Sequence, residues 1–230
     1  MSISKKSFLD LSQHFASDGF KAGFTLRSFP CSSPNDRIRF AEELSLKPSK
    51  LVVPKQIHSN TVYTCHREGR VEGVDALISG NRDMVLSIQV ADCIPLFLLD
   101  NNANICALIH AGWRGTVKKI VTNTIQEMVS IGSKIKDIKA LMGPSIQQCC
   151  FEIGPEVAEK FPKAFLRNGE LDRSYLDLQG VVQTELIDLG IKEKQIIFLS
   201  ECTSCHPEMF HSYRRNGKKA GRMIAICGWV

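Results

Sequence analysis

Cys93, His58 and His110 are the residues of this 230-residue chain whose types best suit metal chemistry. Two imidazole groups and one thiolate are the protein ligands of a typical catalytic zinc site, which keeps a fourth coordination position for water or substrate. A thiolate together with two imidazoles captures zinc readily. The sequence therefore predicts that His58, Cys93 and His110 bind zinc.

Two of these residues border apolar runs that predict a β-hairpin. Residues 94–99 and 105–109 are apolar and flank the polar segment 100–104. A two-residue turn places Cys93 directly opposite His110, whereas a four-residue turn makes them diagonal neighbours on one face. In both cases their Cβ atoms lie roughly 4.5–8 Å apart, within reach of a shared ion. A three-residue turn would instead place Cys93 and His110 on opposite faces of the hairpin. No local feature fixes the distance of His58 from either residue.

Local sequence leaves three roles open for Cys93. It is a metal ligand, a nucleophile with His110 as its base, or a buried core residue. We favour the ligand over the nucleophile. The neighbouring Asp92 is a candidate to orient the ligands through a hydrogen bond, although strand alternation turns it away from the face that carries Cys93.

Arg114 lies in the segment His110–Gly115, where a predicted strand ends and a helix begins near Thr116. Glycines let the backbone approach a ligand closely. Free N–H groups at a helix amino terminus, beside a guanidinium, favour an anion. The other interpretation is a tight turn with a solvated arginine.

Arg214 and Arg215 lie on a predicted hairpin turn over residues 212–217, shortly before Arg222. The planar fork of arginine suits phosphate or carboxylate recognition. A solvated basic turn is the alternative interpretation.

The segment Cys202-Thr203-Ser204-Cys205-His206 matches the pattern for covalent haem attachment. We reject haem because such attachment accompanies export, and residues 1–10 do not resemble a secretory signal. The segment also resembles half of a zinc finger, but no second pair has suitable spacing, the adjacent Cys149 and Cys150 included. We therefore expect a structural or near-site role for it.

Hydrophobic periodicity predicts an α+β fold with mixed sheets. Apolar runs predict strands near 22–26, 51–57, 61–64, 74–79, 84–90, 94–99, 105–109, 138–142, 195–199 and 222–227. Helical spacing predicts helices over 35–44 with Asn35 as the cap, from Thr116 through Met128, over 155–161, and from Leu178 to Gly190.

Composition is that of an ordinary globular protein, with 43% hydrophobic and 23% charged residues. The net charge of +5 is mild and scattered, so we expect an anionic small substrate rather than nucleic acid. No run approaches the ~18 apolar residues of a membrane span. Nine cysteines without an export signal predict reduced thiols and a cytoplasmic location.

Together these stretches resemble the laccase-domain family, also called polyphenol-oxidase-related, whose members are described as purine nucleoside phosphorylases. The matching segments are 55–58, 74–77, 91–95, 110–115, 143–146, 149–154, 201–203 and 210–215. The family often has cysteine and glycine where this chain has Ser145 and Gln147, and its glycine-rich amino-terminal loop is shortened here to residues 27–32.

The resemblance implies a mixed β-sandwich flanked by helices, in a single domain over residues 1–230. It implies the metal ligands His58, Cys93 and His110, with zinc or copper as the ion. It also implies phosphorolysis of adenosine, inosine, guanosine and methylthioadenosine, together with adenosine deamination. We expect Cys93, His110 and Arg114 to be catalytic. We also expect the protein to be a monomer. The residues expected to bind substrate or phosphate are Gln56, Arg114, Arg214 and Arg215.

Three other functions remain open from sequence. A copper-dependent polyphenol oxidase would need ligands for several coppers, and the chain has only six histidines. A cysteine-type amidase acting on cell-wall precursors would use Cys93 as nucleophile and His110 as base. A zinc-stabilised binding protein would have no catalytic activity.

Overall fold

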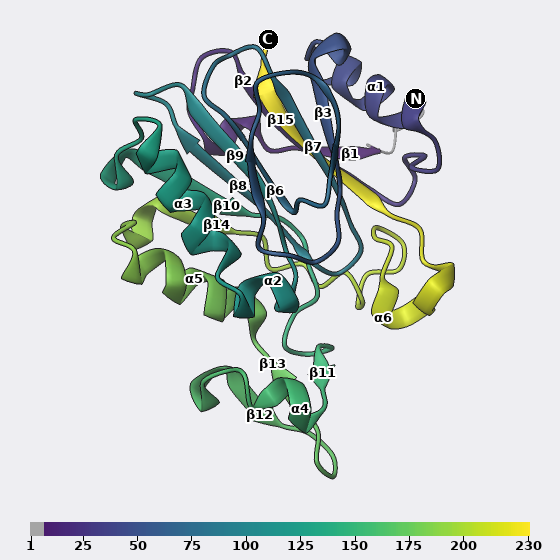
Figure 1. Ribbon diagram of the computed structural model, residues 1–230. Helices are drawn as coiled ribbons and strands as arrows, with labels where there is room; N and C mark the ends of the chain where they lie inside the picture. The colour runs from purple at the N-terminus through teal and green to yellow at the C-terminus, as the bar shows by residue number, and fades with distance from the viewer. Residues whose placement is uncertain (1–6) are drawn as a thin grey trace.

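Two six-stranded β-sheets packed face to face form the centre of the protein (Figure 1). The computed structural model describes residues 7–230, so the first part of the segment examined for a secretory signal, residues 1–6, lies outside the described residues. In spatial order, the first sheet contains β1 (Phe8–Asp10), β2 (Phe20–Thr25), β15 (Met223–Trp229), β7 (Val85–Val90), β3 (Leu51–Lys55) and β5 (Gly69–Glu72). The second contains β14 (Ile196–Phe198), β10 (Ile138–Met142), β8 (Ile94–Asp100), β9 (Ile105–Ala111), β6 (Ala76–Ser79) and β4 (Val62–Thr64).

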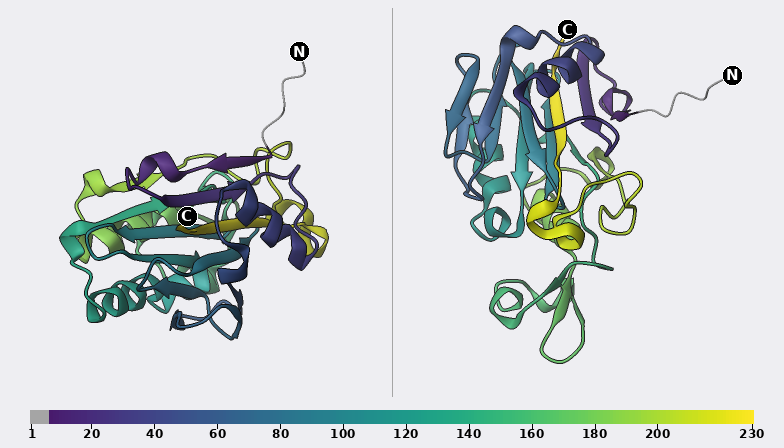
Figure 2. Two further views of the ribbon diagram at one scale, coloured as in Figure 1. Left: turned by 90° about the horizontal axis from the view of Figure 1, so that it is seen from above. Right: turned by 90° about the vertical axis from the view of Figure 1, so that its right-hand side faces the viewer.

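Helices cover the outer faces of both sheets (Figures 1 and 2). The α-helices are α1 (Pro34–Glu43), α2 (Trp113–Val117), α3 (Ile120–Ser130), α4 (Pro155–Ala158), α5 (Leu178–Asp188) and α6 (Tyr213–Asn216). Helix α1 packs on the first sheet, and α3 and α5 pack on the second. Short 3-10 helices are η1 (Ser12–His14), η2 (Pro48–Lys50), η3 (Ile135–Asp137), η4 (Lys163–Phe165), η5 (Glu193–Gln195) and η6 (Gly217–Lys219).

Strand alternation divides the apolar side chains between three layers of core. In β8, Phe97 and Leu99 pack between the two sheets, whereas Leu96 and Leu98 pack against α3 and α5. Both faces of the strand are therefore buried, which explains why its sequence is a continuous apolar run rather than an alternating one. The fold is the expected mixed α+β sandwich flanked by helices.

A small lobe projects from one end of the sandwich (Figures 1 and 2). It contains α4 and a three-stranded sheet of β11 (Glu152–Ile153), β13 (Ser174–Leu176) and β12 (Leu166–Asn168). The sequence predicts neither these strands nor β1 and β5, because each is short and carries little apolar periodicity.

All ten predicted strands are present, but several helix details differ from the prediction. Ser33, not Asn35, caps α1, because its side chain and that of Asp36 form a reciprocal capping box around Pro34. Helix α4 ends at Ala158 instead of residue 161.

The helix expected to start near Thr116 begins at Trp113 and breaks at Lys119, which has φ +66°. The predicted hairpin turn over 212–217 is instead the short helix α6, because the Ser212 side chain accepts a hydrogen bond from the Arg215 N–H. Helix α5 ends as predicted, with Gly190 in the left-handed region at φ +99°. Among the described residues, no helix combines the length and apolar character needed to cross a bilayer.

Phe97→Ala is expected to lower the free energy of unfolding by about 3–5 kcal/mol, because Phe97 is 0% exposed and its loss leaves a cavity between the sheets. Chemical denaturation measures this change. Leu171→Ala, at a position 103% exposed, is the control and should shift stability by less than about 0.5 kcal/mol. Equal effects of the two substitutions would contradict this assignment of the core.

Candidate functional site

The β8–β9 hairpin brings Cys93 close to His110. Its register pairs Pro95 with His110 and Asp100 with Ile105, so the connection is the four-residue turn and not the two-residue one. Cys93 directly precedes β8 and is therefore a diagonal neighbour of His110 on the same face of the hairpin.

His58 completes a three-residue cluster with Cys93 and His110. Their ligand atoms all lie within 4.8 Å of one another. The two imidazole rings meet edge to face with centroids 4.8 Å apart. A Cβ atom on Gly112 would lie 2.8 Å from the Cys93 Sγ, so only glycine fits beside this cluster. The donor set of two nitrogens and one sulfur fits one zinc ion with an open position.

Asp75 holds both histidines, a role that local sequence did not indicate. Its fully buried carboxylate lies 2.8 Å from the His110 Nδ1 and accepts the backbone N–H of His58 at 3.0 Å. The same carboxylate accepts hydrogen bonds from the backbone N–H groups of Ile57 and Ser59 and from the Ser59 hydroxyl. These bonds fix His58 at φ +59° and leave the Nε2 of His110 for a metal.

The cluster carries strongly perturbed acidities. Burial raises the pKa of Cys93, but the charge of His110 and hydrogen bonds from both histidines outweigh burial and lower this pKa to about 6. Burial lowers the pKa of His110, yet the Cys93 thiolate and the Asp75 carboxylate raise it to about 9. Although burial raises the pKa of Asp75, hydrogen bonds from His110 and Ser59 hold it well below its usual range. Without a metal, Cys93 and His110 therefore form a thiolate–imidazolium pair at neutral pH.

Asp92 does not orient the metal ligands, contrary to the sequence-based suggestion. Its carboxylate accepts hydrogen bonds from the Thr203 hydroxyl at 2.6 Å, the Ser212 hydroxyl at 3.1 Å and the Arg214 backbone N–H at 2.6 Å. The physical reason is strand alternation, which points Asp92 away from Cys93. Asp92 instead ties the loop before α6 to the start of β8.

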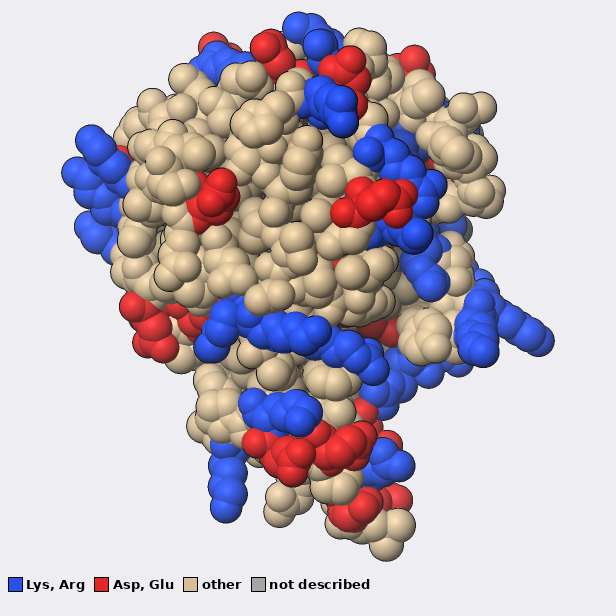
Figure 3. Space-filling view, viewed as in Figure 1, with Lys and Arg blue, Asp and Glu red and all other residues tan. Residues whose placement is uncertain are grey.

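A cleft of about 780 Å³ opens beside the cluster. Its lining includes the three cluster residues and the basic side chains of Lys55, Arg114, Arg214 and Arg222. The guanidinium of Arg114 lies 4.4 Å from the centre of the Trp113 ring. On the face drawn in Figure 3, basic side chains form a band level with α2, between the sandwich and the small lobe. The cleft thus combines a cluster that could hold a metal ion with positive charge.

The other predicted binding residues are placed differently. The Arg214 guanidinium donates to the Glu152 carbonyl and lines the cleft. The Arg215 guanidinium lies outside the cleft lining and donates to the carbonyls of Thr203, Ser204 and Phe210. Gln56 lines the cleft, but its side-chain amide also pairs with the Gln89 backbone, at 2.8 Å in both directions.

A second cluster joins cysteines that the sequence analysis judged unsuitable as partners. Cys149, Cys150, Cys202 and Cys205 lie with their sulfur atoms within 4.8 Å of one another. The expectation that Cys149 and Cys150 could not complete the pair at 202–205 was wrong, because the fold brings the two loops together. Spacing along the sequence does not show which distant segments the fold brings into contact.

The chain is similar to known proteins in sequence and in fold. A family described as multi-copper polyphenol oxidoreductase laccase matches residues 17–229. A protein named adenosine deaminase RL5, from an unknown prokaryotic organism, is 36% identical over 81% of this chain and 78% of its own. A purine nucleoside phosphorylase of Bacteroides thetaiotaomicron is 34% identical over 80% and 75%. The crystal structure of YlmD from Geobacillus stearothermophilus superposes with a TM-score of 0.89 at 25% identity, over 99% and 98% of the two chains.

Asp75→Asn is expected to weaken zinc binding by about 10–100-fold, because the substitution removes the charge that fixes His110 and the loop of His58. Competition with a chromophoric chelator measures the dissociation constant. Asp83→Asn, at an exposed position, is the matched control and should bind zinc like the unmodified chain. Unchanged affinity in Asp75→Asn would contradict the role of Asp75.

Alkylation of Cys93 in metal-free protein is expected to rise with pH around a midpoint near 6, since the thiolate is the reactive form and its pKa is lowered to about 6. Peptide mapping by mass spectrometry measures the rate at each pH. Cys31 is the internal control, because burial raises the pKa of its thiol and should keep it slow at neutral pH. A Cys93 midpoint near the ordinary value of about 8.5 would refute the thiolate–imidazolium pair.

Proposed function

The chain belongs to the multi-copper polyphenol oxidoreductase laccase family, and on that premise we propose that it is a zinc-dependent purine nucleoside phosphorylase that also deaminates adenosine. The relatives named adenosine deaminase and purine nucleoside phosphorylase support an enzyme that acts on purine nucleosides. The proposed substrates are adenosine, inosine, guanosine and methylthioadenosine, with inorganic phosphate. We further propose that residues 1–230 form one monomeric, cytoplasmic domain, without nucleic-acid or membrane partners.

The observation that carries this proposal is the placement of the cluster at a basic cleft. A volume of about 780 Å³ is within the range of about 300–1,000 Å³ typical of small-molecule sites. The lining offers the aromatic rings of Trp113, Phe151 and Tyr213 as surfaces for a purine base. Arg114 and Arg214 bring guanidinium groups suited to phosphate into the same space.

His58, Cys93 and His110 would hold the zinc ion. When bound, zinc supplies Lewis acidity and lowers the pKa of a water molecule to about 7. Asp75 accepts the Nδ1 hydrogen of His110, which leaves Nε2 as the nitrogen that would bind the ion and keeps the ring in one tautomer. For adenosine deamination, the bound ion would supply the activated water whose oxygen replaces the amine on the purine carbon, and the amine would leave as ammonia.

In phosphorolysis, Arg114 and Arg214 hold phosphate in line with the ribose anomeric carbon. A phosphate oxygen forms a bond to that carbon while the bond from the carbon to the purine nitrogen breaks, and the electron pair leaves with the base. Fixed positive charges at the phosphate and an aromatic surface at the base hold the two reactants in this geometry. Because its guanidinium is occupied by three carbonyls, Arg215 acts as a positioning residue for the loop before α6.

Cys93→Ala is expected to reduce turnover of adenosine and inosine by at least about 10²-fold, because it removes a ligand of the proposed ion. Both nucleosides are assayed with and without phosphate, which separates phosphorolysis from deamination. Arg114→Gln should raise the KM for phosphate about 10–100-fold, since a charge-assisted hydrogen bond is lost.

Two matched variants serve as controls for these assays. Cys31→Ser removes a thiol outside both cysteine-containing clusters, and Arg82→Gln removes a guanidinium that donates to Asn104 away from the cleft lining. Both should keep the turnover and KM of the unmodified chain. Full activity in Cys93→Ala would overturn the metal-centred mechanism.

The arrangement of Cys93, His110 and Asp75 favours a second candidate, the cysteine-type amidase. A nucleophile, a base and an acidic residue that orients the base are the parts of a cysteine hydrolase. The two candidates differ in their response to zinc. If Cys93 is a zinc ligand, added zinc protects its thiol from alkylation and does not inhibit purine turnover. Copper-dependent phenol oxidation is separated from both by metal analysis of protein purified without added copper.

A further inference from the structure

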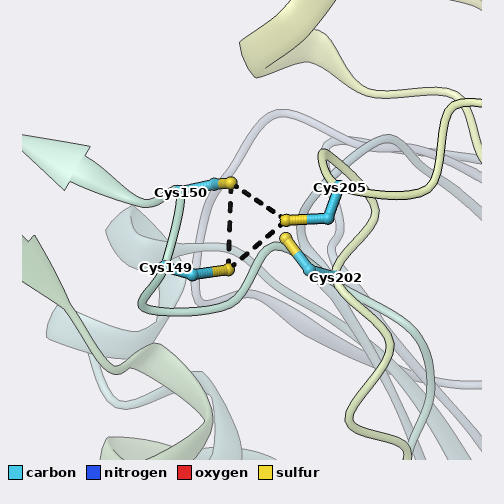
Figure 4. A group of neighbouring side chains, drawn as sticks. All are labelled: Cys149, Cys150, Cys202 and Cys205. Atoms are coloured by element: carbon cyan, nitrogen blue, oxygen red, sulfur yellow. Dashed lines mark hydrogen bonds between the residues drawn. The ribbon is translucent and has the colours of Figure 1, made fainter.

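Two pairs of cysteines from distant segments converge where the small lobe meets the loop before α6 (Figure 4). Cys149 and Cys150 precede β11, and Cys202 and Cys205 follow β14. The Sγ atom of Cys205 lies 3.6 Å from that of Cys149 and 3.4 Å from that of Cys150, and Cys149 and Cys150 are 3.8 Å apart. All four sulfur atoms point toward one common centre.

These spacings match one tetrahedral ion. With zinc–sulfur bonds of about 2.3 Å, the sulfur atoms of a tetrahedral site lie about 3.8 Å from one another. A disulfide would require about 2.05 Å, and all four residues are free thiols. A cluster of several irons needs ligands spread around more than one metal atom, whereas these four sulfurs surround a single point.

The backbone holds the two pairs in place independently of any side-chain bond between them. Ser145 and Cys202 form a parallel β-bridge, and the Thr203 N–H donates to the Ser145 carbonyl at 3.0 Å. A tight turn also shapes each cysteine-containing loop. The Cys205 N–H donates to the Cys202 carbonyl, and the Cys150 N–H donates to the Gln147 carbonyl.

The surroundings of Cys202 favour a thiolate bound to a cation. The Gln147 N–H donates to the Cys202 Sγ at 3.5 Å, a contact that stabilises charge on sulfur. The Arg215 guanidinium donates to the carbonyls of Thr203 and Ser204, both at 2.9 Å, and so brings positive charge to the turn that joins Cys202 to Cys205. Cys149 and Cys205 are exposed, which gives an ion a path of entry.

We propose that Cys149, Cys150, Cys202 and Cys205 bind a second zinc ion, in a closed structural site. Four sulfur ligands leave no position for substrate. The ion fastens the start of the small lobe to the loop before α6. Phe151 directly follows Cys150, and Arg214 lies in α6, so both segments adjoin the cleft wall. This site goes beyond the proposed function and does not depend on it, because its test is the number of bound ions.

Metal analysis of purified protein tests the proposal. The unmodified chain and the control Cys31→Ser are expected to hold about two zinc ions per chain, whereas Cys202→Ser/Cys205→Ser and Cys93→Ala each hold about one. Equal zinc contents in Cys202→Ser/Cys205→Ser and the unmodified chain would overturn the proposal. Stoichiometric iron in place of zinc would overturn the choice of metal. If His58, Cys93 and His110 bind no zinc, the result is different: Cys93→Ala and the unmodified chain then have equal zinc contents.

A second measurement leaves all four cysteines intact, so it does not depend on the folding of a cysteine variant in this cluster. Cobalt(II) added to metal-free Cys93→Ala should give, at one equivalent, the intense visible bands of a tetrahedral site and a sulfur-to-metal charge-transfer band. Adding zinc should abolish both. Absence of these bands, or mass spectrometry that finds disulfides among the four residues in freshly purified protein, would refute the site.

Discussion

The buried carboxylate of Asp75 is the interaction on which the cluster of His58, Cys93 and His110 depends. Three backbone N–H groups, the Ser59 hydroxyl and the His110 ring all converge on its two oxygens. An ionised carboxylate without such partners would be too costly to bury. The same bonds that make its burial tolerable also hold the His58 loop and the His110 ring together. The same hydrogen bonds therefore both position the two histidines and stabilise the charge of the Asp75 carboxylate.

A second carboxylate, Asp92, performs the matching task for the opposite wall of the cleft. It directly precedes Cys93, has φ +84°, and ties Thr203, Ser212 and the start of α6 to the end of β7. Cys93 thus belongs to the cluster whose histidines Asp75 holds, and it directly follows Asp92, which holds the loop before α6. Because both carboxylates sit at strand ends, the sheets set the distance between the metal-binding cluster and the arginine of the cleft wall.

Sequence reasoning succeeded where a local rule applied and failed where distant segments meet. Strand parity sufficed to place Cys93 and His110 on one face, since both belong to one hairpin. His58 needed the parallel pairing of β3 with β7, and the Cys149–Cys202 region needed the bridge at Ser145, neither of which has a local signal. Arg215 shows a further limit: residue type predicts a phosphate ligand, whereas three nearby carbonyls occupy the guanidinium.

The two clusters differ in the chemistry that their ligands allow. Two nitrogens and one sulfur at the edge of a cleft leave a position for substrate, whereas four sulfurs at a loop junction close the coordination sphere. Several coppers would require many more imidazoles, yet within residues 7–230 only two histidines join a cluster that could hold a metal. This ligand chemistry is the reason for proposing one catalytic and one structural zinc instead of the several coppers in the family's description.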